Sequence, residues 1–481
     1  MACSHLRGLL LLWVLIPATA VMAQGKEECL QQAGFSALVQ SRGLDDLDAL
    51  QRLREEYDKR GRCGEELLYQ LVERHFQQQE PLLEARLPRT VQLGEDFLAY
   101  GARLQGRGAV YQTIGYFILG RVGQKLEKLG NAPRHEELIK RLAAQRVHVA
   151  VKGENKAAAN LRQGNWKYLG KRAWQKVVEL LTTVADSFED SLGPEFFAEY
   201  FEAPRVQNAR WMLLPRPKVD LPANASVYTL TARGGDSQGS AIWMPRPQFR
   251  AHYLAAGNVA STFRQMTGTR SVALFMTGGF TNAQRQPEGL TVDRGTIVNA
   301  VLMPDRHGLV IVEENGGIRV INLKRDLIQL PLGTRSTQEI GNPFASLIAY
   351  SRLLEWCRTR RATLFQTQLL LYGDELLIDP EKVKHQLRER RLLALVSDKS
   401  TGAAHHVVFD ITQNVRLDEP AVKLQELLSQ RNMKVEALLN LDVGNYNILG
   451  VLDARGRTLR EPQGPVPVDR ATNLLVYTVA R

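Results

Sequence analysis

The sequence predicts an α+β protein in which an all-helical N-terminal domain precedes a domain built on a mixed sheet. Three observations lead to this prediction. The chain has 481 residues, more than one hydrophobic core usually serves. Apolar residues recur at helical spacing as far as about residue 203, whereas short strands and turns follow residue 225. Prolines cluster between these two parts.

The first 23 residues are typical of a cleaved secretory signal. Arg7 precedes the apolar run "GLLLLWVLIPATAV", and small residues end the segment at Ala23. A retained membrane anchor is the alternative, but a run of about 14 residues is shorter than the roughly 20 that span a bilayer. We therefore expect an exported protein, either periplasmic or extracellular.

Cysteine usage fits an oxidising compartment. Three cysteines remain after removal of the signal. Cys29 and Cys63 could form a disulfide that joins two N-terminal helices, and the sequence leaves open whether this bridge forms. Cys357 is left over, and we expect it to be buried on a helix. No cysteine pair has C-x-x-C spacing, so the sequence gives little support for a zinc site, and we expect no metal and no cofactor.

The composition and charge narrow the classes of partner. A chain with 44% hydrophobic and 23% charged residues is ordinary for a globular protein, which excludes disorder for most of its length. The formal charge of +11 favours acidic partners such as anionic polysaccharide or lipid headgroups. We expect no nucleic-acid partner, because no basic stretch is interleaved with aromatic residues. A basic surface without any partner is an equally good interpretation.

Residues 24–203 are predicted to form the helical domain. The clearest helix is "NWKYLGKRAWQKVVELLTTVADSF", residues 165–188, where Trp166 and Trp174 lie near one apolar face. Such an aromatic stripe is more often core than a membrane contact, although a peripheral contact with a membrane surface stays open. We find no catalytic constellation in this domain. If the protein binds a partner without catalysis, this domain would be its docking surface.

Residues 204–226 are predicted to be a proline-rich linker, and residues 227–481 the α+β domain. Prolines at this density prevent helix and favour an extended connector. Beyond the linker, "SVALFMT", "GTIVNAVLMP" and "GLVIVEENGGIRVINL" are predicted strands, the last with a hairpin signal at Asn315-Gly316. Two helices interrupt them, at residues 342–362 and 419–433, with Asp418 expected to cap the second.

Three segments of this domain place polar residues where predicted strands begin or end. The first is "FMTGGFTNAQRQPEGLTVDRGTIVN", residues 275–299, and the second is "RERRLLALVSDKSTGAAHHVVFDI", residues 388–411. The third, "ALLNLDVGNYNILG" at residues 437–450, follows the second helix directly. Because strand ends meet at the rim of a sheet, we expect Asp442 to lie in one cleft with Gly278 and Gly279.

The order of these segments resembles the phosphodiester glycosidase domain, a family of enzymes that remove a sugar from a phosphodiester. Gly278, Gly279 and Phe280 match its Gly-Gly-Phe motif, and Asn440, Leu441, Asp442 and Gly444 match its Asn-Leu-Asp-Gly motif. Arg391 is placed like the arginine that opens a strand in the family. The resemblance covers roughly residues 225–481, and it implies a hydrolase of sugar phosphodiester or related glycosidic linkages in envelope or extracellular polysaccharide.

The resemblance and the chemistry together assign roles to the candidate residues. Asp442 would be the catalytic carboxylate, Arg391 the phosphate clamp through its bidentate fork, and Glu288 a second carboxylate. The amides of Gly278 and Gly279 would form a small anion nest beside Phe280. Further substrate contacts are expected from Asn440 and Gly444 of the Asn-Leu-Asp-Gly motif and from Asn445, which follows it.

Each of these residues also has a purely structural interpretation. Asp442 and Asn440 are residues that commonly satisfy the backbone of a turn, and Arg391 is one of several charges in a basic run. Where the family has further glycines, this chain has Val443 and Tyr446, which we expect to obstruct close approach of a ligand to the backbone. The second function left open is therefore a catalytically inactive relative that binds a glycan or an envelope protein.

Overall fold

The computed structural model describes most of residues 82–149 and 210–480 and three short stretches before them. The described residues are 68–69, 72–73, 76–77, 82–149 except 105–107, 131–132 and 148, and 210–480 except 217–220, 233–234, 270, 283, 332–336, 374, 379–386 and 461–463. The predicted signal peptide, Cys29, Cys63 and the helix expected at residues 165–188 lie outside them. Their predictions therefore stay predictions.

The N-terminal part is helical where it is described, as predicted. Its helices are α5 (Leu87–Arg103), α6 (Ala109–Leu129) and α7 (Glu136–Ala144), with short 3-10 turns at Glu84–Arg86 and Pro133–His135. α5 and α6 pack very closely because glycines lie between them: a Cβ added to Gly94 would meet Leu119 at 2.7 Å. Gly130 follows the last residue of α6 and caps the helix, and its φ of 67° suits a helix C-terminus.

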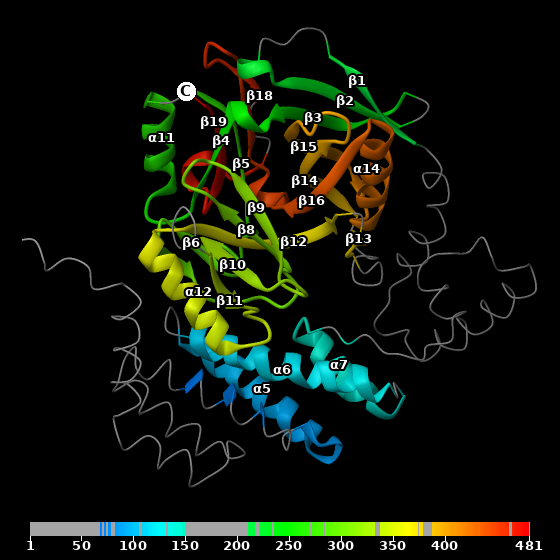
Figure 1. Ribbon diagram of the computed structural model, residues 1–481, viewed down its shortest axis with the longest axis vertical. Helices are drawn as coiled ribbons and strands as arrows, with labels where there is room; N and C mark the ends of the chain where they lie inside the picture. Colours follow the sequence, from blue (N-terminus) through cyan, green and yellow to red (C-terminus); the bar gives the residue numbers. More distant parts are fainter. Residues whose placement is uncertain are drawn as a thin grey trace, which may run out of the picture.

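A twelve-stranded sheet forms the centre of the C-terminal part (Figure 1). Its main path runs through β1 (Trp211–Pro215), β2 (Ser226–Ala232), β3 (Ser237–Pro245), β15 (Ala404–Val415), β14 (Arg388–Asp398), β16 (Met433–Leu441), β12 (Thr363–Tyr372), β6 (Thr291–Asp293) and β7 (Thr296–Asn299). Off this path, β12 also pairs with β13 (Glu375–Leu376) and with β8 (Gly308–Val312), which pairs with β9 (Ile318–Asn322).

Two smaller sheets complete the domain. One runs through β18 (Thr458–Arg460), β17 (Leu449–Leu452), β5 (Val272–Met276), β19 (Leu474–Val479) and β4 (Phe249–Leu254), and the other pairs β10 (Ile328–Pro331) with β11 (Thr337–Gly341). Every strand pairing in the described part of the chain is antiparallel, so the prediction of a mixed sheet is wrong, although the α+β class is confirmed. Short hairpin turns, such as Asn315-Gly316 between β8 and β9, produce this pattern.

Both predicted helices of this domain are present. α12 (Leu347–Arg360) carries the buried Cys357, as expected, and α14 (Asp418–Gln430) leads directly into β16. Asp418 does not cap α14 as predicted, because its carboxylate is bound by Arg416 in front of the helix. α11 (Val259–Thr269) and short 3-10 turns at Pro222–Asn224, Arg246–Gln248, Gly444–Tyr446 and Val468–Arg470 make up the rest.

One hydrophobic cluster joins the helical part to the sheet part. Ile118 and Leu142 from the helices belong to the same buried cluster as Leu309 of β8 and Tyr350 of α12. In Figure 1, α12 lies between the N-terminal helices and the sheet. The two predicted domains therefore share a core where they meet.

Part of the predicted linker belongs to the sheet. Residues 211–215 form β1, which pairs with β2 along its whole length, and Trp211 and Leu213 are buried. Pro215 ends this edge strand, which is a position that tolerates the missing amide hydrogen.

In the described part of the chain, no helix is both long and apolar enough to cross a membrane.

Candidate active site

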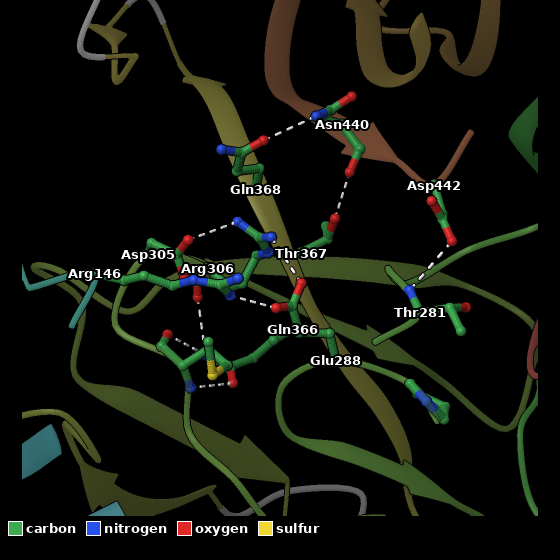
Figure 2. A network of polar contacts seen from close by, with 12 residues as sticks. Arg146, Thr281, Glu288, Asp305, Arg306, Gln366, Thr367, Gln368, Asn440 and Asp442 are labelled. Carbon is green, nitrogen blue, oxygen red and sulfur yellow. Dashed lines mark hydrogen bonds and ion pairs between the residues drawn. The ribbon is translucent and has the colours of Figure 1, made fainter. Parts of the chain in front are cut away.

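The ends of two strands from different sheets meet at Asp442. The backbone amide of Asp442, directly after β16, donates at 3.2 Å to the carbonyl of Gly278, two residues after the end of β5. The amide of Thr281 in turn donates to Oδ2 of Asp442 at 3.2 Å (Figure 2). The structure thus brings together the Asn-Leu-Asp and Gly-Gly-Phe segments.

The turn that follows Asp442 is made possible by Gly444. Its φ of 78° lies in the left-handed region, and it opens the 3-10 turn Gly444–Tyr446. Val443 adopts an extended conformation with φ −138° and ψ −159°, which valine accepts without strain. Valine at position 443 therefore costs the backbone little.

Asp442 lines a large cationic cleft. The cleft has a volume of about 1670 Å³, which exceeds the roughly 300–1,000 Å³ of ordinary small-molecule pockets. Among the described residues of its lining, seven are arginine or lysine and three are carboxylates: Arg146, Arg285, Arg306, Lys324, Arg388, Arg390 and Arg470 against Asp305, Glu389 and Asp442. An anionic ligand, longer than a single sugar, suits this volume and charge.

The Asp442 carboxyl is suited to hold a proton near neutral pH. The residue is 8% exposed, and this burial raises its pKa to about 7, against the lowering effect of hydrogen bonds from Thr281 and the Val443 amide and of the charge on Arg391. At pH 7 a substantial fraction of the protein therefore carries a protonated Asp442. A carboxyl group with this property is able to act as a general acid.

Arg391 is a structural residue, and its predicted role as a phosphate clamp is wrong. It is completely buried, and its guanidinium donates to Oδ1 of Asp410 at 2.8 Å, to the carbonyl of Ile448 at 2.9 Å and to Oδ1 of Asn447 at 2.5 Å. Its side chain is absent from the lining of the cleft. The fork is thus engaged by the protein, where it holds the chain after Gly444 against the sheet.

The preceding arginine occupies the position expected of the clamp. The antiparallel register pairs Arg391 with Leu441, which sets Arg390 beside Asp442, and successive side chains of a strand point to opposite faces. Arg390 lines the cleft with Arg388 and is 7% exposed. Burial and the neighbouring charge of Arg388 lower the pKa of Arg390 to about 10, against the influence of Asp418. A bound anion would offset this repulsion.

The predicted anion nest is not available to a ligand. The amide of Gly278 donates to Oδ1 of Asn473 at 3.0 Å, and the carbonyl of Gly279 accepts from Nδ2 of Asn473 at 3.0 Å. Both glycines are buried, and neither lines the cleft. Glycine is nevertheless required at position 278, because a Cβ there would meet the ring of Tyr253 at 2.8 Å.

Glu288 and Phe280 belong to a charged cluster beside the cleft. Figure 2 labels its charged members Arg146, Glu288 and Arg306. Oε2 of Glu288 accepts from Arg306 at 2.8 Å, and Oε1 accepts from Arg146 of the helical part. Burial raises the pKa of Glu288, but the two guanidinium groups outweigh burial and hold it below its usual value. The guanidinium of Arg306 lies 4.5 Å from the centre of the Phe280 ring. Glu288 is thus an ionised partner of two arginines.

Asn440 is hydrogen-bonded to two residues of β12 at the cleft. Its Nδ2 donates to Oε1 of Gln368 at 2.8 Å, and its carbonyl accepts from the hydroxyl of Thr367. Asn440 and Gln368 both line the cleft, as do Gly444 and Asn445. Of the predicted substrate-binding residues, Phe280, Asn440, Gly444 and Asn445 therefore reach the cleft, whereas Gly278 and Gly279 lie behind it.

Gln366 fixes the loops around the charged cluster. It is fully buried, and its amide satisfies four backbone groups: Oε1 accepts from Leu290 at 2.8 Å and Met303 at 3.0 Å, while Nε2 donates to the carbonyls of Met303 at 3.2 Å and Arg306 at 2.8 Å. Gln366 and Gln368 are not among the site residues predicted from the sequence. The signal was present, because "QTQ" interrupts the otherwise apolar strand "TLFQTQLLLY".

In the described residues, no three His, Cys, Asp or Glu side chains lie close enough together to bind a metal ion. Among the described residues of the cleft lining, the charged and titratable groups include the buried carboxyl group of Asp442, the partly buried carboxylates of Asp305 and Glu389, and several guanidinium groups.

Comparisons with known proteins find remote structural similarity only. No family model matches the chain, and no curated protein matches it. Among solved structures, the zebrafish N-acetylglucosamine-1-phosphodiester alpha-N-acetylglucosaminidase catalytic domain, auto-inhibited by its pro-peptide, is 13% identical with a TM-score of 0.33, over 57% of this chain and 88% of that one. A hypothetical protein from Synechocystis is 14% identical with a TM-score of 0.28, over 56% of this chain and 68% of that one. Neither similarity establishes a shared family.

Proposed function

We propose that this protein is an exported hydrolase of the bond between a sugar and a phosphate group in anionic polysaccharide, with Asp442 as the general acid. The observation that carries the proposal is the position of Asp442, a buried carboxyl group with a pKa of about 7 in the wall of a large cationic cleft. The resemblance of residues 275–299, 388–411 and 437–450 to the phosphodiester glycosidase domain supports the same activity.

The proposed reaction uses few residues. Arg390 and Arg388 hold the phosphate group, and Asn440 with Gln368 contacts the sugar. The bond between the anomeric carbon and the phosphate oxygen breaks, its electron pair stays on that oxygen, and the proton of Asp442 passes to it. A water molecule adds to the anomeric carbon and releases its proton to solvent.

The test is an assay of the purified protein on a panel of sugar 1-phosphodiesters beside the matching neutral glycosides. The proposal expects turnover of the phosphodiesters and little of the neutral compounds, because only the former match the charge of the cleft. Turnover restricted to neutral glycosides, or none on any member of the panel, would contradict it. Cell fractionation with N-terminal sequencing tests export, and a mature chain starting near Gln24 is the expected result.

A binding module without catalysis is the second candidate function. The observation in its favour is that Glu288, the predicted second carboxylate, has both oxygens engaged by Arg146 and Arg306. Such a module would bind an anionic glycan or another envelope protein in the same cleft. Glycan binding by a protein that shows no turnover on the panel would decide for this candidate.

A further inference from the structure

The helical part contributes a residue to the cleft wall. Arg146 lies just beyond α7, and Ala143, Arg146 and Val147 all line the cleft that contains Asp442. The side chain of Arg146 is 51% exposed, yet its guanidinium pairs with Oε1 of Glu288 across a sequence separation of 142 residues. The helical part therefore contacts the candidate site directly.

The backbone around Arg146 is held firmly. Arg146 has a φ of 62°, a conformation that costs a non-glycine residue free energy and persists only when its surroundings enforce it. Its amide donates to the carbonyl of Ala143 at 2.9 Å, and the amide of Val147 donates to that of Leu142 at 2.9 Å. Leu142 and Val147 are buried in the cluster shared with the sheet part.

Glu288 ends a loop that leads back to Asp442. We call residues 280–288 the site loop; all of them except residue 283 are described. The amide of Glu288 donates to the carbonyl of Phe280 at 2.6 Å, and Thr281 pairs with Pro287, so the two ends of the loop are fastened together. The next contact is the hydrogen bond from the Thr281 amide to Asp442 at 3.2 Å.

These contacts form a short path: Arg146 to Glu288, Glu288 to the base of the site loop, and the base of the loop to Asp442. Figure 2 shows the last step, the hydrogen bond between Thr281 and Asp442. We propose that Arg146 is a positioning residue, through which the helical part holds the site loop against Asp442 and sets the protonation of that carboxyl group. The inference rests on the proposed function in one respect only, which is that Asp442 donates its proton as the general acid.

The test measures the Asp442 carboxyl itself. The full chain is labelled with ¹³C at the aspartate carboxyl groups, Asp442→Asn identifies the signal, and the signal is titrated in wild type and in Arg146→Gln. Since the Thr281 hydrogen bond favours the ionised carboxylate, its weakening in Arg146→Gln is expected to raise the pKa of Asp442 by about one unit. Hydrogen exchange at the Thr281 amide is expected to accelerate in the same variant.

A second variant separates positioning from direct electrostatics. Removing the positive charge of Arg146 would by itself raise the pKa of a nearby carboxyl group, whereas removing the negative charge of Glu288 would lower it. Positioning through the site loop predicts that Glu288→Gln raises the pKa of Asp442, as Arg146→Gln does. Opposite shifts in the two variants would overturn the proposal.

The matched control is Arg141→Gln, in α7, the helix that precedes Arg146. Arg141 pairs with Glu95 inside the helical part and does not line the cleft. It is expected to change neither the pKa of Asp442 nor the exchange of Thr281. An equal shift in Arg141→Gln would show that loosening the helical part in general is the cause, and an unchanged pKa in folded Arg146→Gln would also contradict the proposal. None of these readouts requires turnover, so they stand even where the proposed hydrolase activity fails.

Discussion

The amide of Thr281 donates to Oδ2 of Asp442 at 3.2 Å and so connects two segments that are 161 positions apart in the sequence. The contact holds the carboxylate at the junction of the central sheet with the smaller sheet that contains β5. Asp442 is mostly buried. This burial raises its pKa to about 7, although the hydrogen bond from Thr281 acts in the opposite direction.

The first prediction concerns stability against pH. Because the pKa of Asp442 is raised in the folded state, the folded protein binds a proton more tightly than the unfolded chain does. This contribution favours folding below about pH 4 and is lost as the pH rises through about 7, to a total on the order of a few kcal/mol. Urea unfolding of wild type and Asp442→Asn from pH 4 to 8 measures it.

The expected outcome is a wild-type free energy of unfolding that falls relative to that of Asp442→Asn across this range. The variant lacks the titrating group and keeps the same shape, so the difference isolates Asp442. A difference that stays constant with pH would mean that the carboxyl group is ionised throughout.

The second prediction separates the two neighbouring arginines. Arg391→Gln leaves Asp410 buried without its ion pair, and we expect a loss of about 3–5 kcal/mol in the free energy of unfolding. Arg390→Gln removes a buried cation that Arg388 repels, so its effect on stability is expected to be within about 1 kcal/mol. Calorimetric titration with glucose 1-phosphate should show binding to wild type that Arg390→Gln weakens at least about tenfold.

Equal destabilisation by the two substitutions would contradict the assignment of Arg391 to structure and Arg390 to ligand. Undiminished binding of glucose 1-phosphate by Arg390→Gln would also contradict it.

The third prediction concerns the turn after Asp442. Gly444→Ala places a Cβ in open space but keeps a φ of 78°, so it should lower stability by about 1 kcal/mol through backbone strain alone. Gly120→Ala is the matched control, because Gly120 lies within α6 with open space around it. There the same change should raise stability by about 0.5–1 kcal/mol. Thermal unfolding of both variants checks the opposite signs.

The fourth prediction concerns the two parts of the chain. The sequence predicts limited proteolysis within about residues 203–226. Because residues 211–215 form β1, we now expect the cut before that strand, at residues 204–210. Because the helices and the sheet share one buried cluster, the two fragments should co-elute in size-exclusion chromatography after cleavage and separate only in denaturant. Separation of the fragments in native buffer would show that the shared cluster does not hold the parts together.

Much of the fold was predictable because it depends on local patterns. Short apolar runs located β14 and β16, helical spacing located α12 and α14, and Asn315-Gly316 located a hairpin. The antiparallel order of the large sheet could not be predicted in this way. β3 pairs with β15 across more than 150 residues of intervening chain, and no local pattern encodes that pairing.

The candidate site was predictable at its centre and not at its edges. The meeting of Asp442 with the Gly-Gly-Phe segment follows from two strand ends at one rim. The sequence could not decide between Arg390 and Arg391, because a shift of one residue along a strand exchanges the buried and the ligand-facing side chain. Arg146 lies in another part of the chain, and only tertiary packing brings it to Glu288.

The most direct test of the hydrolase proposal is the pH dependence of turnover of a sugar 1-phosphodiester by wild type and Asp442→Asn. If Asp442 is the general acid, wild-type turnover falls as the pH rises through about 7, and Asp442→Asn lacks turnover while it remains folded and still binds glucose 1-phosphate. Turnover by Asp442→Asn at the wild-type rate, with the same pH dependence, would contradict the assignment of Asp442.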